Sequence, residues 1–332
     1  MLMTKGRIFS GMQPSGRFHL GNYMGALENW VRLQHEYECF FSIVDLHALT
    51  SSYSDTSKLQ ENVMEMAIDW LSAGLDPEKN VIFVQSHVKE HAELALLLGM
   101  STPLSWLERV PTYKDKLQNW SAQGKDNNTY GFLGYPVLMA ADIMLYKATC
   151  VPVGGDQSAH LELTREIVRR FNYLYNREVF PEPQAVFSKA KVLPGIDGRK
   201  MSKSYGNTIP FGAGPEEMWE RIRMMTTDPQ RIKKTDPGHP EVCIVYAFHK
   251  VFNPEEYEEI GARCRAGEIG CVECKKRLAE KMNALLADIH TKREELSKKP
   301  EYIKEVLDYG AQRARKEAEK TMAEVKTAMN VL

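Results

Sequence analysis

The segment Lys200-Met201-Ser202-Lys203-Ser204 gathers two lysines and two serines within five residues. It follows Gly195-Ile196-Asp197-Gly198-Arg199, whose glycines and aspartate predict a turn-rich, mobile loop. Ammonium groups and short hydroxyl donors stabilise the negative charge that develops on a departing pyrophosphate. The alternative interpretation is a solvated basic loop. We expect the pentapeptide to contact a polyphosphate.

A second segment with phosphate-binding chemistry lies near the N-terminus. The run Phe9 to Gly16 leaves a predicted strand through a small-residue turn, and His19-Leu20-Gly21-Asn22 opens the next predicted helix. Such a turn lets a nucleotide approach the backbone, and a helix N-terminus presents unpaired N–H groups to phosphate. An ordinary helix start would fit the four residues as well. The absence of G-x-G-x-x-G and Walker A sequences argues against the usual dinucleotide and P-loop sites.

One predicted helix places a single carboxylate among apolar and aromatic side chains. Tyr135, Met139, Asp142 and Tyr146 are spaced at i, i+4, i+7 and i+11, so they share a helical face. A buried carboxylate is costly unless a donor reaches it. An indole N–H is such a donor, because it has no acceptor function. An arginine or a backbone N–H would also satisfy Asp142, and spacing alone leaves both interpretations open.

Four of the six cysteines crowd between Cys243 and Cys274. Cys39 and Cys150 stand alone in apolar surroundings, which is typical of core residues. Four thiolates without a pairing pattern fit either a [4Fe–4S] cluster or a Cys₄ zinc site. The remaining alternative is four unligated thiols. The candidate metal ligands are Cys243, Cys264, Cys271 and Cys274.

The elements that must position these residues alternate between strand and helix in the first half of the chain. This order predicts a parallel sheet with right-handed crossovers. Strands are expected at 7–12, 39–44 and 81–84, and helices at 20–34, 57–71 and 90–98.

The rest of the chain is predicted to be mainly helical. A polar stretch at 102–127, broken by two prolines, is interpreted as an insertion, and 180–198 returns the chain to the sheet. From Gly214 onward helices dominate, because β-branched runs become scarce. Further helices are expected at 136–147, 156–173 and 302–331.

The length, composition and net charge limit which fold classes, partners and cellular locations are expected. With 332 residues, 43% hydrophobic and 26% charged, the chain can bury a large core divided into two or three lobes. Its formal net charge of −1 neither supports nor excludes a nucleic-acid partner. No apolar run is long enough to cross a membrane, and no secretory signal follows the N-terminus. We therefore expect no membrane partner and a cytoplasmic location.

The two phosphate-binding segments together resemble the paired signatures of class I aminoacyl-tRNA synthetases. The first signature ends in Gly21-Asn22, which is similar to the tryptophanyl branch. Residues 43–50, 135–146 and 151–157 also resemble bacterial tryptophanyl-tRNA synthetases, in the order of that family. The resemblance implies an α/β fold: a Rossmann-like parallel-sheet catalytic domain with a helical insertion, followed by an all-helical anticodon-binding domain.

The resemblance also implies the reaction and its partners. It implies ATP-dependent attachment of L-tryptophan to tRNA(Trp) through a tryptophanyl-adenylate, with release of AMP and pyrophosphate, by a homodimer. Mg²⁺ is expected on the phosphates of ATP. Some members of the family hold an iron–sulfur cluster with a similar cysteine set, although the first cysteine interval is shorter here. We expect a [4Fe–4S] cluster in a structural or anticodon-positioning role, with zinc as the alternative.

Individual roles follow from matching positions in the family. The acid at the position of Asp142 accepts the indole N–H, and we expect Lys200, Ser202 and Lys203 to be catalytic. ATP-binding residues are expected at Gln13, Ser15, His19, Gly21, Asn22, Gly154, Asp156, Lys200, Met201, Ser202, Lys203 and Ser204. Tryptophan-binding residues are expected at Phe9, Gln13, His47, Tyr135, Met139, Asp142, Val151, Val153 and Gln157.

Domain boundaries follow from the same resemblance. The catalytic domain is expected at 1–112 and 181–212, the second part carrying the Lys200–Ser204 loop. The helical insertion at 113–180 would hold the dimer interface and part of the tryptophan pocket, and 213–332 the anticodon-binding domain. Three rival functions remain: a tyrosyl-tRNA synthetase, a small-molecule nucleotidyltransferase, and a non-enzymatic RNA-binding iron–sulfur protein.

Overall fold

A five-stranded parallel sheet forms the centre of the molecule. The computed structural model describes residues 5–122, 128–154, 158–187 and 193–331. The strand order is β3-β2-β1-β4-β5, with every pair parallel, which confirms the predicted α/β class. Two of the three predicted strands have the expected bounds, and the other is shifted by one residue. The strands are β1 (Arg7–Met12), β2 (Glu38–Ile43), β3 (Val81–Val84), β4 (Cys150–Val153) and β5 (Gln184–Phe187).

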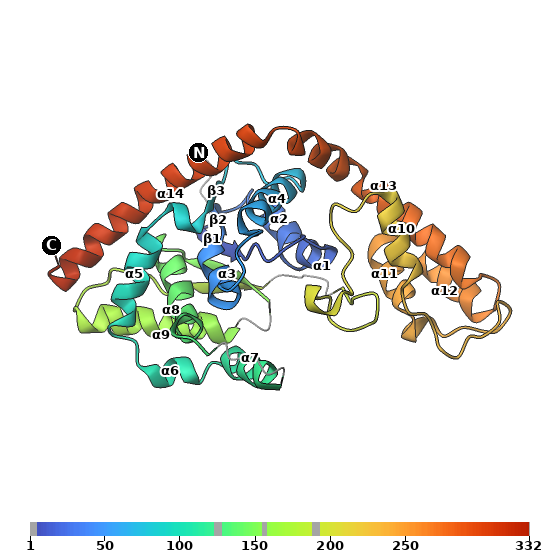
Figure 1. Ribbon diagram of the computed structural model, residues 1–332, viewed down its shortest axis with the longest axis horizontal. Coiled ribbons are helices and arrows are strands. Elements are labelled where there is room, and N and C mark those ends of the chain that lie inside the picture. The colour runs from blue at the N-terminus through green and yellow to red at the C-terminus, as the bar shows by residue number, and fades with distance from the viewer. Residues whose placement is uncertain (1–4, 123–127, 155–157, 188–192, 332) are drawn as a thin grey trace.

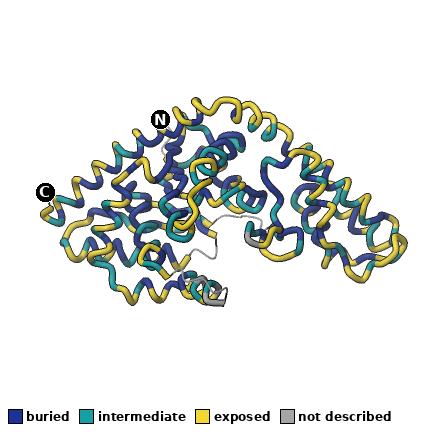
Figure 2. Tube along the Cα trace, in the orientation of Figure 1, coloured by how far each residue is buried: buried dark blue, intermediate teal, exposed yellow. Residues whose placement is uncertain are grey.

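Both faces of the sheet are covered, so its strands are apolar on both sides (Figures 1 and 2). Ile8 and Phe41 point into one hydrophobic cluster, whereas Phe9 and Phe40 point into the other. This alternation is the two-residue period of a strand. The helices of the first half are α1 (Leu20–Asn22), α2 (Glu28–Leu33), α3 (Asp45–Ser52), α4 (Leu59–Ser72) and α5 (Glu90–Gly99), with a π-helical turn at Tyr23–Leu27 between α1 and α2.

The insertion is helical from its start. Pro103 immediately precedes one helix and Pro111 begins the next, so these prolines start helices instead of interrupting them. The helix expected from residue 136 begins six positions earlier, where the Thr129 hydroxyl accepts from the Phe132 N–H at 3.2 Å, and it accommodates Pro136 in its interior. The helices are α6 (Leu104–Glu108), α7 (Pro111–Ala122), α8 (Tyr130–Leu145) and α9 (Ser158–Leu174).

The C-terminal helices form a lobe and then return to the sheet. In Figure 1, α10, α11 and α12 gather with the start of α13 at one end, and α14 runs back along the sheet. Helix α14 packs on β3, α4 and α5, and a Cβ added at Gly310 would lie 1.8 Å from the Ile82 carbonyl oxygen. Such a close approach requires glycine. The bounds are α10 (Pro215–Arg223), α11 (Ile244–Phe252), α12 (Tyr257–Arg265), α13 (Cys271–Ser297) and α14 (Pro300–Met329).

Within the described ranges, no helix combines the length and the apolar character needed to span a bilayer.

Candidate active site

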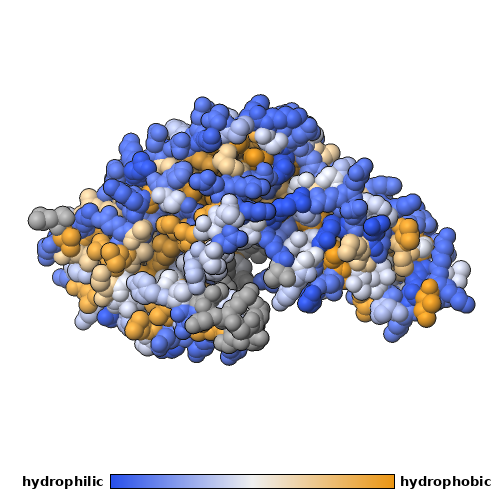
Figure 3. Space-filling view, in the orientation of Figure 1, coloured by the Kyte–Doolittle hydropathy of each residue, from blue (hydrophilic) through white to orange (hydrophobic). Residues whose placement is uncertain are grey.

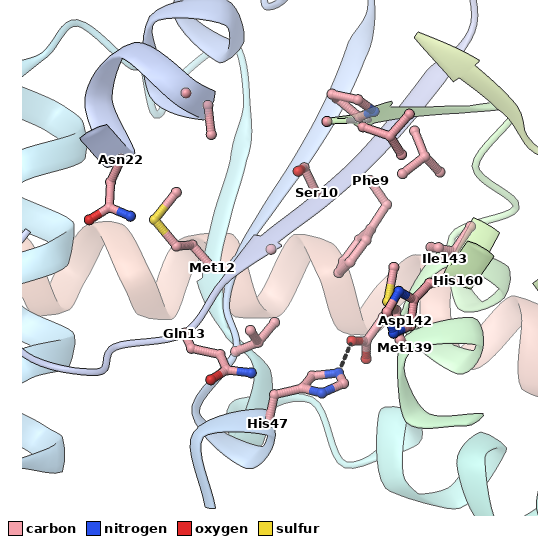
Figure 4. Close-up of a pocket in the computed structure, with 18 of the residues that line it drawn as sticks. Phe9, Ser10, Met12, Gln13, Asn22, His47, Met139, Asp142, Ile143 and His160 are labelled. Atoms are coloured by element: carbon pink, nitrogen blue, oxygen red, sulfur yellow. Dashed lines mark hydrogen bonds and ion pairs between the residues drawn. The ribbon is translucent and has the colours of Figure 1, made fainter. Parts of the chain in front are cut away.

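A cavity of about 530 Å³ opens at the carboxyl ends of β1 and β4. The strand order reverses between these two neighbours, and ligands of open parallel sheets bind at such a switch point. Helices α1, α3 and α8 supply further walls (Figure 4). Of the expected site residues, those that line the cavity are Phe9, Gln13, Gly21, Asn22, His47, Tyr135, Met139, Asp142, Val151, Val153, Gly154 and Lys200.

The two predicted phosphate-binding segments meet at one end of this cavity. The Leu20 N–H donates to the Ile209 carbonyl and the Phe211 N–H to the Phe18 carbonyl, both at 2.9 Å. These backbone bonds hold the residues that follow the Lys200–Ser204 loop against the start of α1. The Lys203 ammonium then reaches back to Ser15 Oγ at 3.3 Å and to the Gly16 carbonyl oxygen at 2.9 Å.

His19 is the N-cap of α1 and does not line the cavity. Its Nδ1 accepts from the Asn22 N–H at 3.2 Å, while the Asn22 side chain accepts from the His19 N–H. Burial, aided by the nearby Lys203 charge, lowers the pKa of His19 to about 4. The imidazole is therefore neutral at physiological pH and carries its proton on Nε2.

Asp142 lies at the opposite end of the cavity and is almost fully buried. Its Oδ2 accepts from His47 Nε2 at 2.8 Å, the bond drawn in Figure 4, and its Oδ1 accepts from Gln85 Nε2 and His91 Nδ1, each at 2.7 Å. Burial opposes ionisation, but the His47 and His91 interactions outweigh it and hold the pKa of Asp142 at about 2. The cavity therefore contains a permanently ionised carboxylate.

A polar pair from α8 and α9 also lines the cavity. The Tyr135 hydroxyl and His160 Nε2 are 2.8 Å apart, and both residues line the cavity. Burial raises the pKa of Tyr135 to about 12, so the phenol stays protonated. Met139 and Asp142 of α8 line the same cavity.

Several expected residues lie elsewhere. Ser15, Ser202 and Lys203 lie outside the cavity lining, and Met201 is buried with its sulfur beside Gly21. Asp156 and Gln157 fall outside the described residues, as does the side chain of Ser204.

The sequence interpretation missed part of the site. The π-helical turn adds cavity-lining positions on the first helix, and such turns recur at functional sites. The sequence pattern did not indicate Gln85 or His91, because only the packing of α5 against α8 and the turn after β3 bring them to Asp142. The additional residues include Met12, Gly25, Ala26, Asn29, Thr112 and His160 in the lining, and Gln85 and His91 behind Asp142.

The four clustered cysteines come together in the C-terminal lobe. Burial raises the pKa of Cys274 to about 12, and the nearby thiols of Cys243, Cys264 and Cys271 act in the same direction. Cys243 is the N-cap of α11, and Cys271 begins α13. Among the residues that the structure describes, however, no three His, Cys, Asp or Glu side chains are arranged to hold a metal ion.

Comparison with known proteins agrees with this geometry. The family described as tRNA synthetases class I (W and Y) matches residues 3–287. The tryptophan–tRNA ligase of Thermotoga maritima is 52% identical over 98% of this chain and 99% of its own length. The tryptophan–tRNA ligase of Aquifex aeolicus is 44% identical over 98% of this chain and 100% of its own length.

A solved structure gives the same result. The crystal structure of tryptophanyl-tRNA synthetase from Campylobacter jejuni, complexed with ADP and tryptophan, matches with a TM-score of 0.88 and 38% identity. The match covers 98% of this chain and 100% of that one. With its parallel sheet, its match to the family over residues 3–287 and these full-length relatives, the chain belongs to the tryptophanyl-tRNA synthetase family of class I aminoacyl-tRNA synthetases.

Proposed function

We propose that the cavity activates L-tryptophan with ATP and that the chain transfers the product to tRNA(Trp). The tryptophan carboxylate attacks the α-phosphate of ATP, which gives tryptophanyl-adenylate and pyrophosphate. A terminal ribose hydroxyl of the tRNA then takes the acyl group and releases AMP. The observation that carries this proposal is the ionised Asp142 in a cavity that also contains the start of α1 and Lys200.

Asp142 recognises the indole ring. Two donors occupy Oδ1 and one occupies Oδ2, so Oδ2 keeps one acceptor position for the indole N–H. Phe9, Met139, Val151 and Val153 provide the apolar walls around the ring. A phenylalanine side chain would leave the buried Oδ2 without this donor, and sites built on hydrogen bonds reject such substrates strongly.

The polar groups next to Asp142 hold the amino acid backbone. The Tyr135 hydroxyl and Gln157 bind the ammonium group, and Gln13 lies toward the carboxylate and ATP. Tyr135 supports this role because it lines the cavity on the same helix as Asp142, seven positions earlier.

Nucleotide binding occurs at the other end of the cavity. Asn22, Gly21 and Gly154 border the nucleotide, with Asp156 nearby, and the Nε2 proton of His19 donates to it. Lys200, Ser202 and Lys203, with Met201 and Ser204, close on the pyrophosphate side, and Mg²⁺ binds through the phosphates. The ammonium and hydroxyl groups stabilise charge on the departing pyrophosphate, so no general base is needed.

Amino-acid-dependent pyrophosphate exchange tests the activation step. We expect exchange with tryptophan and, at equal concentration, little with tyrosine, phenylalanine or the other amino acids. Charging of tRNA(Trp) then tests the transfer step. Exchange that depends on tyrosine instead of tryptophan would contradict the pocket assignment.

We further propose that Cys243, Cys264, Cys271 and Cys274 hold a [4Fe–4S] cluster, or zinc as the alternative. The donor chemistry supports this proposal, because cysteine sulfurs are the ligands that both iron–sulfur clusters and Cys₄ zinc sites use. Arg231 adds a donor to Cys264 Sγ at 3.5 Å. The bound group would fasten the loop before α11 to α12 and α13, in a structural or anticodon-positioning role.

Metal analysis decides this proposal. After anaerobic purification we expect about four irons and four sulfides per chain for a cluster, or about one zinc for the alternative. Cys264→Ser should lower the content, whereas Cys39→Ser, at a buried thiol of β2, should not. A folded, metal-free wild-type protein would contradict both forms of the proposal.

The assembly follows the same family pattern. The catalytic domain comprises 1–112 and 181–212, the insertion 113–180 forms a homodimer interface, and helices of the 213–332 segment bind the anticodon. Exposed apolar side chains on and near the insertion support the interface, and Figure 3 shows hydrophobic residues gathered over this part of the surface. The reaction takes place in the cytoplasm, where its tRNA is found. Light scattering should give the mass of a dimer, and Met100→Glu, at a side chain 72% exposed, should weaken it.

A further inference from the structure

A buried chain of hydrogen bonds extends from Asp142 away from the cavity. His91 Nδ1 lies 2.7 Å from Asp142 Oδ1, and His91 Nε2 lies 2.7 Å from the Tyr146 hydroxyl. The side chain of His91 is fully buried, and Tyr146 is fully buried as well. Neither residue lines the cavity, so any effect on the substrate must act through Asp142.

The order of protons along this chain follows from the ionised carboxylate. Since Asp142 can only accept, the facing nitrogen of His91 must carry a proton. Nε2 of a neutral imidazole is then an acceptor, and the Tyr146 hydroxyl donates to it. If His91 Nε2 donated instead, the Tyr146 hydroxyl oxygen would accept, and its own proton would need another acceptor. No hydrogen bond from this hydroxyl to another acceptor is found among the described residues. Both hydrogen bonds then run toward Asp142.

This arrangement fixes how the carboxylate meets the cavity. Gln85 and His91 use both acceptor positions of Oδ1, which leaves Oδ2 with His47 and one open position. Rotation of the buried carboxylate would break these hydrogen bonds. The carboxylate is therefore held with an acceptor ready for a ring N–H.

Tyr146 also connects this chain to the wall of the pocket. Its ring stacks on Phe9, with centroids 5.6 Å apart and planes 8° from parallel, and Phe9 lines the cavity. The His91 ring packs beside Phe9 and Phe83, with centroids 6.3 and 5.8 Å away. The ring and the hydroxyl of Tyr146 thus have separable roles: the ring supports the apolar wall, and the hydroxyl sets the tautomer of His91.

We propose that His91 and Tyr146 are positioning residues that make the enzyme selective for a ring N–H by holding Asp142 as an oriented acceptor. This inference rests on the proposed function, since it assumes that Asp142 receives the indole N–H. It predicts that loss of either residue weakens recognition of that one group more than recognition of the rest of the substrate.

The test compares tryptophan with 3-(1-benzothiophen-3-yl)alanine, in which sulfur replaces the ring N–H. For each variant, pyrophosphate exchange gives the ratio of kcat/KM for tryptophan to kcat/KM for the analogue. We expect Tyr146→Phe, which keeps the ring, to lower this ratio about three- to tenfold, the usual effect of one neutral hydrogen bond. His91→Phe should lower it roughly 10- to 100-fold, because its bond is to a charged group. The KM for ATP should stay unchanged.

Two controls separate this effect from a change in folding. Tyr113→Phe removes a hydroxyl that donates to Asn128 at 2.8 Å in the same hydrophobic cluster, and its ratio should equal that of the wild type. In an Asp142→Ala background, Tyr146→Phe should leave the ratio unchanged. If His91→Phe fails to fold, Tyr146→Phe alone decides the outcome.

The failures are distinguishable. A wild-type enzyme without tryptophan-dependent exchange would contradict the proposed function itself. An active wild type whose variants lose activity equally with both substrates would overturn the positioning role, because a purely structural effect does not depend on the ring N–H.

Discussion

Lys203 Nζ donates to the Gly16 carbonyl oxygen at 2.9 Å, across 187 positions of the chain. The bond places an ammonium group at the turn before α1, beside the end of the cavity where the phosphates of ATP are expected. Burial lowers the pKa of Lys203 to about 8, despite the opposing influence of Asp69. The pKa of Lys203 is therefore close to physiological pH, so the fraction of Lys203 that carries a positive charge changes with pH in this range.

The first prediction concerns this titration. Only protonated Lys203 can stabilise the pyrophosphate, so kcat/KM for ATP should fall as the pH rises through about 8. Lys203→Arg keeps its charge at higher pH, and its alkaline limb should move upward. His19, with a pKa of about 4, stays neutral above that pH and therefore adds no transition to the neutral and alkaline part of the kcat/KM profile. Pyrophosphate exchange at subsaturating ATP measures the profile, and a wild-type profile that is flat up to about pH 9.5 would contradict the assignment.

A second prediction concerns the packing of the loop on α1. A Cβ at Gly21 would lie 3.0 Å from His19 Nδ1 and 3.3 Å from Met201 Sδ. Gly21→Ala should therefore displace the imidazole or the loop and raise the KM for ATP roughly tenfold, while the KM for tryptophan changes little. Gly134→Ala is the matched control, because a Cβ at this α8 position meets nothing within 4 Å. Equal effects on both KM values would count against the nucleotide site.

A third prediction concerns the contact between α4 and the C-terminal lobe. Asp69 is 3% exposed and accepts from Arg293 Nε of α13 at 2.7 Å. Burial raises its pKa from 3.8 to about 6, more than Arg293 lowers it. The folded protein therefore binds this proton more tightly than the unfolded chain does. The stabilising contribution is complete below about pH 4 and is lost as the pH rises through about 6.

Denaturant unfolding at several pH values measures this contribution. Since the asparagine does not titrate, the free energy of unfolding of wild type minus that of Asp69→Asn should decrease by up to about 3 kcal/mol between pH 4 and pH 7.5. Asp308→Asn, at a side chain 66% exposed, serves as the charge-matched surface control. A difference that increases with pH would mean that the Arg293 ion pair outweighs burial.

A fourth prediction tests how α14 is held on the sheet. Gly310→Ala would force the helix away from the Ile82 carbonyl, because the added Cβ would lie 1.8 Å from it. We expect a loss of about 1–3 kcal/mol in the free energy of unfolding. Gly99→Ala, at an α5 position where a Cβ meets nothing within 4 Å, should not destabilise the protein. Thermal unfolding of both variants checks the prediction, and equal melting temperatures would refute the close packing.

The sequence by itself determined the features that depend on neighbouring residues. The apolar runs of β1 and β3 predicted both strands with the observed bounds, because strand formation there follows from β-branched and aromatic residues. The types and order of the residues at 9–22 and 200–204 predicted two phosphate-binding segments. The spacing on the predicted helix correctly placed Tyr135, Met139 and Asp142 on one wall of one cavity, whereas Tyr146, expected on the same face, is buried behind that wall.

Only the tertiary structure decided which distant groups meet. Asp142 lies 57 positions from Gln85 and 51 from His91, and their hydrogen bonds depend on the packing of α5 and of the turn after β3 near α8. The close contact between Gly310 and Ile82 likewise depends on the path of α14 across the sheet. A local sequence pattern indicates which polar side chains need a hydrogen-bonding partner, because burying them without one is costly. Which residue becomes that partner depends on how whole helices and strands pack.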